Sequence, residues 1–102
     1  MKQITQSQFE AEVANGHSFV MFSGVGCGNC KMQETLLASL MTEFSSVNFI
    51  KVNTAESGDL VSQFGVVTLP TMILFKDGEA LETLVGLKPK PVLAKRFAEF
   101  FV

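Results

Sequence analysis

Residues 24–33 read "GVGCGNCKMQ" and contain the only two cysteines of the 102-residue chain. The run before them, "SFVMF" at 18–22, is almost continuously apolar and predicts a strand buried on both faces of a parallel sheet. The run after them, 27–44, spaces its apolar residues as a helix does: Met32, Leu36, Leu37, Leu40, Met41 and Phe44. The two cysteines therefore lie where a glycine-rich loop joins a strand to a long helix.

Two flanking segments extend this unit into a sheet. Before it, Ser7 and Glu10 have the spacing of a capping box that starts a helix, and Gly16 is placed to stop one. A short helix is therefore predicted between Ser7 and Gly16. After it, "VNFIKVN" at 47–53 predicts a second strand. A strand, a helix and a strand in this order form a right-handed crossover, so the sheet is expected to be at least partly parallel.

The C-terminal half continues with a helix and a hairpin. A helix is predicted over 56–64 with Gly65 as its stop, and two β-rich runs surround a turn at 77–78. Pro89 and Pro91 lie where a last helix can begin. The predicted order of elements is α, β, α, β, α, β, β, α.

The composition limits the class of protein. Apolar residues make up 47% of the chain and charged residues 18%, which is typical of a globular protein, and the length suits one domain over residues 1–102. The net charge is -2 and there is no basic run, so nucleic acid is not expected as a partner. No apolar run reaches the roughly 18 residues of a membrane span, and the N-terminus does not read as a secretory signal. We therefore expect a cytoplasmic monomer that binds no membrane.

The spacing of Cys27 and Cys30 predicts reversible disulfide chemistry. Three residues of helix return to nearly the same face and separate the two Cα atoms by about 5 Å, within the roughly 4.4 to 6.8 Å that a disulfide accepts. Cys27 falls at the helix start, where unpaired N–H groups and the helix dipole favour its thiolate, so it is the expected nucleophile. Cys30 lies one turn further in and is expected to resolve the mixed disulfide.

Two other uses of the cysteines have less support. They could be small buried apolar residues, but their position at a strand-to-helix junction favours redox chemistry. Zinc normally needs four ligands, and the chain offers these two cysteines and His17, which is expected in a solvent-facing turn before the strand. A metal site would need a second chain, so no metal is expected.

Four motifs then resemble the thioredoxin family over essentially the full length of the chain. They occur in the family's order: "CGNCKM" at 27–32, "IKVN" at 50–53, "LPTMILFKDGE" at 69–79 and "LVG" at 84–86. The resemblance implies an α/β architecture, the thioredoxin fold, with a central mixed β-sheet flanked by helices on both faces. It also implies a cis peptide bond before Pro70.

The resemblance further implies a substrate site around the cysteines. In family members the proline lies beside the two cysteines, and the backbone of the residue before it, here Leu69, pairs with an extended substrate. The expected substrate-binding residues are Gly26, Gly28, Asn29, Leu69, Pro70 and Gly86. An apolar rim with Val25 and Val67 suits a protein segment better than glutathione.

Three residues depart from the family pattern. Asn29 stands in place of a proline between the cysteines, which removes a restraint on φ and is expected to make the pair more oxidising. Gly26 replaces a usual Trp, so an aromatic contact surface is missing. Met21 replaces a buried Asp that helps to move a proton to or from the resolving cysteine, so Cys30 is expected to be activated less well.

Two charged residues have roles that the sequence leaves open. Lys51 matches the lysine that partners the missing Asp, and it is expected either to support proton transfer or to reach solvent as an ordinary strand lysine. Glu34, four residues beyond Cys30, is expected on the solvated face of the helix.

The sequence therefore predicts an enzyme, a protein thiol-disulfide oxidoreductase. It is expected to reduce disulfides in protein substrates by dithiol exchange through Cys27 and Cys30. No bound cofactor is expected, and the resemblance implies that electrons come from a thioredoxin-reductase-like donor. Two alternatives stay open: a disulfide oxidase or isomerase of the same fold, and a non-catalytic binding module.

Overall fold

One mixed sheet organises the protein in the computed structural model, which describes residues 1–101. Within these residues the sheet has five strands in the order β1-β3-β2-β4-β5. The strands are β1 Lys2–Ile4, β2 His17–Ser23, β3 Asn48–Asn53, β4 Thr71–Lys76 and β5 Glu79–Val85. β3 runs parallel to both β1 and β2, whereas β4 is antiparallel to β2 and β5. The expected mixed sheet is confirmed.

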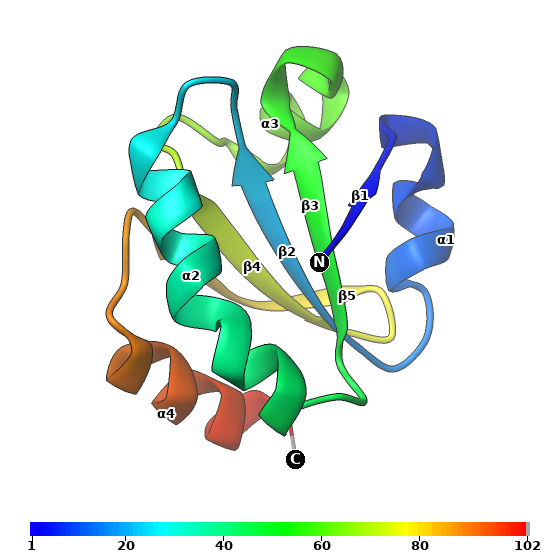
Figure 1. Ribbon diagram of the computed structural model, residues 1–102. Coiled ribbons are helices and arrows are strands. Elements are labelled where there is room, and N and C mark those ends of the chain that lie inside the picture. The colour runs from blue at the N-terminus through cyan, green and yellow to red at the C-terminus, as the bar shows by residue number, and fades with distance from the viewer. Residues whose placement is uncertain (102) are drawn as a thin grey trace.

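Helices cover both faces of this sheet (Figure 1). The helices are α1 Phe9–Val13, α2 Gly28–Glu43, α3 Gly58–Phe64 and α4 Lys90–Phe100. α2 and α4 lie together on one face, and α1 and α3 lie on the other. Two short 3-10 turns, Gln6–Gln8 and Thr54–Glu56, precede α1 and α3.

The alternation of side chains along each strand divides the core into two layers. In β2, Phe19 and Met21 point to the α2 and α4 side, while Val20 and Phe22 point to the α1 and α3 side. Both sets are fully buried. This pattern explains why the apolar run is continuous, because each face of a central strand needs its own apolar residues.

The N-terminal prediction was wrong in two respects. The chain begins with a strand, β1, where the predicted order began with a helix. β1 is three residues long and is held by pairing with β3, so it has too few residues for a period of two to be visible. The capping pair also differs from Ser7 and Glu10, because Thr5 N donates to Gln8 Oε1 at 2.8 Å.

The other predicted elements are confirmed, with boundaries that differ by one or two residues. Asp77 and Gly78 have φ values of 49° and 84°, which are the left-handed conformations of the tight turn expected between the hairpin strands. Gly65 ends α3, and Pro89 is the N-cap of α4. Glu56 belongs to the 3-10 turn and not to α3, whose first residue is Gly58.

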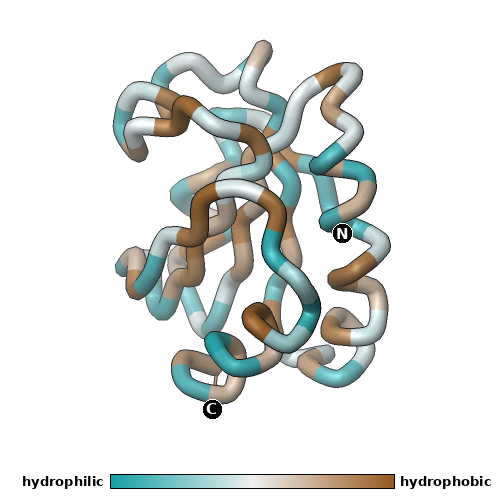
Figure 2. Tube along the Cα trace, turned by 90° about the vertical axis from the view of Figure 1, so that its left-hand side faces the viewer, coloured by the Kyte–Doolittle hydropathy of each residue, from teal (hydrophilic) through white to brown (hydrophobic). Residues whose placement is uncertain are grey.

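Apolar residues recur along the helices and strands and do not gather in one long helical run (Figure 2). No helix in residues 1–101 is both long enough and apolar enough to cross a membrane.

Candidate active site

Cys27 and Cys30 are joined by a disulfide at the start of α2. Their Cα atoms are 5.3 Å apart, which agrees with the spacing expected from the helix. Cys27 is the N-cap residue and Cys30 lies in the first turn. The sequence therefore located the cysteine pair and its helix correctly.

The loop before Cys27 turns sharply so that the sulfur can cap the helix. Cys27 N donates to Gly24 O at 3.4 Å, which closes a four-residue turn. Gly26 occupies the third position of this turn with φ at 75°, the conformation for which a type II turn requires glycine. An L-residue at position 26 would therefore have to adopt a left-handed conformation that favours glycine.

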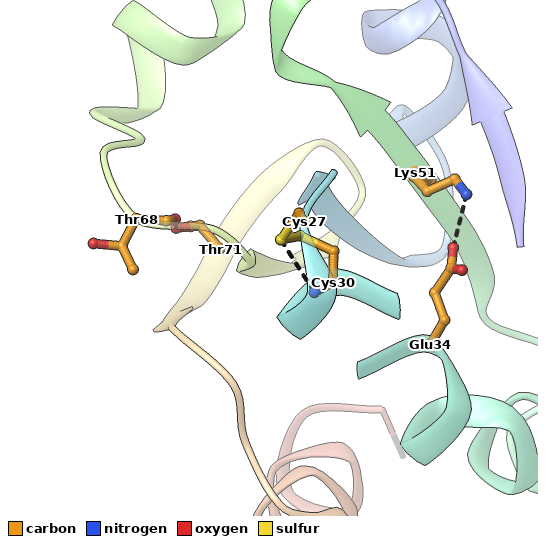
Figure 3. Close-up of a disulfide and its surroundings, with 6 residues drawn as sticks. All are labelled: Cys27, Cys30, Glu34, Lys51, Thr68 and Thr71. Atoms are coloured by element: carbon orange, nitrogen blue, oxygen red, sulfur yellow. Dashed lines mark hydrogen bonds and ion pairs between the residues drawn. A yellow bond between two sulfur atoms is a disulfide. The ribbon is translucent and has the colours of Figure 1, made fainter. Parts of the chain in front are cut away.

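The sulfur of Cys27 receives a hydrogen bond from the helix. Cys30 N donates to Cys27 Sγ at 3.1 Å, as Figure 3 shows. N–H groups at a helix N-terminus and the helix dipole both favour negative charge on a capping atom. This arrangement stabilises a thiolate on Cys27 when the disulfide is reduced.

The two cysteines differ in exposure. Cys27 is half-buried, while Cys30 is 3% exposed. Cys30 belongs to the core layer that also contains Met21 and Met72. Only Cys27 is open to a large reactant.

The segment before β4 lies beside the cysteine loop. The Leu69–Pro70 peptide bond is cis, as expected, and Thr71 pairs with Phe22 at the end of β2. The side chain of Leu69 fills the space next to Gly24, where an added Cβ would lie 3.0 Å from Leu69 Cδ1. The backbone of Leu69 makes no hydrogen bond within residues 1–101.

Gly86 joins the same neighbourhood through the backbone. Gly86 N donates to Pro70 O at 2.8 Å. Three segments therefore meet near the disulfide: the cysteine loop, the cis-proline segment and the end of β5. Of the expected substrate-binding residues, Gly26, Gly28 and Asn29 belong to the cysteine loop and the start of α2, Leu69 lies against Gly24 of that loop, and Gly86 is bonded to Pro70.

Lys51 has a partner that the sequence did not identify. Lys51 Nζ lies 2.8 Å from Glu34 Oε1, and both side chains are partly exposed. Figure 3 shows the pair on the side of the disulfide away from Thr68 and Thr71. Glu34 is therefore not a free solvated carboxylate, and it neutralises Lys51 although Met21 replaces the family Asp.

Two further side chains, Met32 and His17, differ from the expected positions, and the burial of Gln33 was not predicted. Met32 was predicted on the apolar face of α2 but is 54% exposed, while Gln33 is fully buried. Gln33 makes hydrogen bonds to the backbone of Lys88, in the connection that follows β5. His17 is the first residue of β2, and its ring lies 5.2 Å from that of Phe101. Among residues 1–101 no three His, Cys, Asp or Glu side chains gather as a metal site.

Known proteins are similar to this chain in sequence and fold. The family model described as Thioredoxin matches residues 1–99. The chain is 40% identical to the thioredoxin of Chlamydia muridarum over 92 residues, which is 90% of each chain. It is 34% identical to the thioredoxin of Staphylococcus saprophyticus over 94 residues, 91% of this chain and 90% of that one.

A solved structure of Plasmodium falciparum thioredoxin has the same fold. It superposes with a TM-score of 0.88 over 98% of this chain and 99% of that chain, at 24% identity. Family, fold and a cysteine pair at the start of α2 agree with one another. The chain belongs to the thioredoxin family and is a thiol-disulfide oxidoreductase.

Proposed function

We propose that this protein reduces disulfides in protein substrates, with Cys27 as the attacking and Cys30 as the resolving residue. The observation that carries this assignment is the hydrogen bond from Cys30 N to Cys27 Sγ at the start of α2. It favours the thiolate on Cys27, which is also the more exposed of the two cysteines. The buried Cys30 is suited to an attack within the protein.

The reaction balances as two thiol-disulfide exchanges. The Cys27 thiolate attacks one sulfur of the substrate disulfide, which forms a mixed disulfide and releases the other substrate sulfur as a thiolate. The Cys30 thiolate then attacks Cys27 Sγ, forms the Cys27–Cys30 disulfide and releases the second substrate thiolate. The substrate gains two electrons and two protons, and a separate dithiol donor must return the protein to its reduced form. That donor is proposed to be a thioredoxin-reductase-like protein, so the chain carries electrons between two proteins and needs no bound cofactor.

Substrate binding is proposed at the backbone of Leu69. Its N–H and C=O make no hydrogen bond within residues 1–101, and they are therefore open to pair with an extended peptide. Pro70, Gly86 and the exposed residues 26, 28 and 29 would border that peptide. Val25 and Val67 are largely exposed beside them and offer an apolar surface to its side chains.

Lys51 is proposed to support proton transfer as part of its ion pair with Glu34.

Residues 1–102 are proposed to act as a single domain and as a monomer. The proposed compartment is the cytoplasm, because reduced dithiols are maintained there; cell fractionation with an antibody would test this.

Single-cysteine variants test the roles of the two sulfurs. With dithiothreitol as the donor, wild-type protein is expected to reduce insulin, and Cys27→Ser and Cys30→Ser are both expected to lose turnover. After reduction and removal of dithiothreitol, Cys30→Ser is expected to trap one substrate molecule per protein as a mixed disulfide, while Cys27→Ser traps none. Equal trapping by both variants would contradict the assignment, and wild-type protein without insulin reduction would refute the proposed activity.

The reactivity of Cys27 with pH tests the stabilised thiolate. The rate of alkylation by iodoacetamide in the reduced protein is expected to rise with a midpoint below about 8.5, the pKa of a free cysteine. The Cys30→Ser variant isolates the signal of Cys27. A midpoint at the value of a free thiol would show that the helix start does not activate this sulfur.

A further inference from the structure

Gln33 is a polar side chain with no exposure to solvent, and it lies on the core face of α2. The other buried residues of that helix are Cys30, Leu37 and Leu40. An amide in such a position is strongly unfavourable unless its donor and acceptor are both bound. Its hydrogen-bond partners therefore have to account for its presence in the core.

Both polar atoms of the Gln33 amide bind the backbone of one residue, Lys88. Gln33 Nε2 donates to Lys88 O at 3.0 Å, and Lys88 N donates to Gln33 Oε1 at 2.8 Å. These bonds join residues 55 positions apart in the sequence. They give both polar atoms of the amide and both backbone polar groups of Lys88 a hydrogen-bond partner, as pairing with a neighbouring strand would for Lys88.

Lys88 lies in the connection between β5 and α4, residues 86–89, which contains no helix or strand. Gly86 at its start donates to Pro70 O, and Pro89 at its end caps α4. Within residues 1–101, Gln33 is the only side chain that hydrogen-bonds to the backbone of this connection. Without Gln33, the backbone of Lys88 would have no hydrogen-bond partner among residues 1–101.

The connection is thus bonded to both sides of the active site. Its Gly86 end is bonded to the cis-proline segment. Its Lys88 end is bonded to α2, one helical turn beyond Cys30. The position of Gly86 relative to the disulfide therefore depends on a side chain that does not itself contact the proposed substrate surface.

We propose that Gln33 is a positioning residue, which holds residues 86–88 in place to receive an extended protein substrate and so sets the affinity for protein disulfides. It takes no part in the thiol exchange. The proposal rests on the proposed reduction of protein disulfides and adds the means by which one border of the substrate site is fixed.

Two variants separate this role from a purely structural one. Gln33→Leu has a similar size and cannot form either bond, so KM for insulin is expected to rise about tenfold while kcat changes less than about twofold. The rate with hydroxyethyl disulfide should change less than about twofold, because this small molecule can reach Cys27 without resting on residues 86–88. The backbone N–H of Lys88 is expected to exchange with solvent at least about tenfold faster.

Gln33→Glu provides a rescue by pH. A neutral carboxyl can donate to Lys88 O and accept from Lys88 N as the amide does, whereas a carboxylate cannot donate. Burial at this fully enclosed position raises the pKa of a carboxyl above its usual value. The ratio of the insulin KM of Gln33→Glu to that of wild type is therefore expected to be near one at about pH 5 and to increase by about pH 8. This variant also keeps the proposal testable if Gln33→Leu does not fold.

The matched control is Leu40→Val, which reduces packing on the same buried face of α2 and removes neither hydrogen bond between Gln33 and Lys88. It is expected to leave the insulin KM unchanged. Three results would overturn the proposal. Leu40→Val could raise the insulin KM as much as Gln33→Leu does, Gln33→Leu could lose activity equally with insulin and with hydroxyethyl disulfide, or Gln33→Leu could leave activity with both substrates unchanged. Wild-type protein inactive on insulin would instead refute the proposed function, so the two failures can be told apart.

Discussion

Replacing Gly26 by alanine isolates the backbone conformation on which the position of Cys27 depends. Gly26 has φ at 75°, and an L-residue in this region costs about 1 to 2 kcal/mol. Alanine also restricts the unfolded chain, which offsets about 0.4 to 1 kcal/mol of that cost. No atom lies within 4 Å of a Cβ added at Gly26, so no steric clash adds to the balance. The expected loss is about 1 kcal/mol in the free energy of unfolding.

Gly28→Ala is the matched control. Gly28 is the first residue of α2, has no positive φ, and also has open space around an added Cβ. Alanine in a helix is more favourable than glycine, so this variant is expected to be as stable as wild type or up to about 1 kcal/mol more stable. The two substitutions add the same methyl group on either side of Cys27 but have opposite expected signs.

Thermal unfolding of the oxidised proteins, followed by circular dichroism, measures the difference. A loss of about 1 kcal/mol corresponds to a Tm lower by about 5 °C in a chain of this length. Gly26→Ala and Gly28→Ala with equal Tm values would refute the reasoning, because the turn at Gly24 would then accept any residue. Gly26→Trp carries the same backbone cost, so restoring the family residue is expected to lower stability as well.

Three further predictions concern stability and its pH dependence. A hydrogen bond from Lys2 and, to a smaller extent, one from Asn48 lower the pKa of Glu12. Glu12 therefore stabilises the folded protein above the usual carboxyl pKa, and this contribution is lost as pH falls through the lowered pKa. In urea unfolding, Glu12→Gln should be less stable than wild type at about pH 7 and equal to it at about pH 2. Met21→Asp buries a carboxyl in a fully enclosed site, which raises its pKa, so the loss of stability should be larger at about pH 7 than at about pH 4, opposite in direction to the effect at Glu12. Leu37→Ala removes a fully buried side chain and is expected to cost about 2 to 5 kcal/mol in urea unfolding; a loss below about 1 kcal/mol would mean that the α2 core layer collapses around the gap.

Local sequence signals located most of the fold. The hairpin turn at Asp77 and Gly78 and the start of α2 depend on residues adjacent in the chain, so their patterns were readable. β1 was missed because its pairing partner, β3, lies far along the chain and its own three residues carry no period. A short strand that is stabilised mainly by pairing with a distant strand cannot be recognised from the pattern of its own residues.

In the active site, too, features set by local sequence were predicted and features set by contacts between distant segments were not. The spacing of Cys27 and Cys30 is a local property of the helix, and the structure agrees with it. The pairing of Glu34 with Lys51 and the burial of Gln33 depend on contacts between distant segments. A glutamine on a helix is normally solvated, so nothing near Gln33 in the sequence indicates that its partners are the backbone atoms of Lys88.

The hydrogen bond from Cys30 N to Cys27 Sγ makes one backbone amide a reporter of the redox and charge state of the site. A thiolate is a stronger acceptor than a neutral sulfur, so this bond strengthens when Cys27 is reduced and ionised and weakens when its sulfur is bonded to a substrate or to Cys30. The nitrogen and proton resonances of Cys30 should therefore move with each chemical step. Nuclear magnetic resonance of this single amide in nitrogen-15-enriched protein would follow turnover without a coloured substrate or a coupled enzyme.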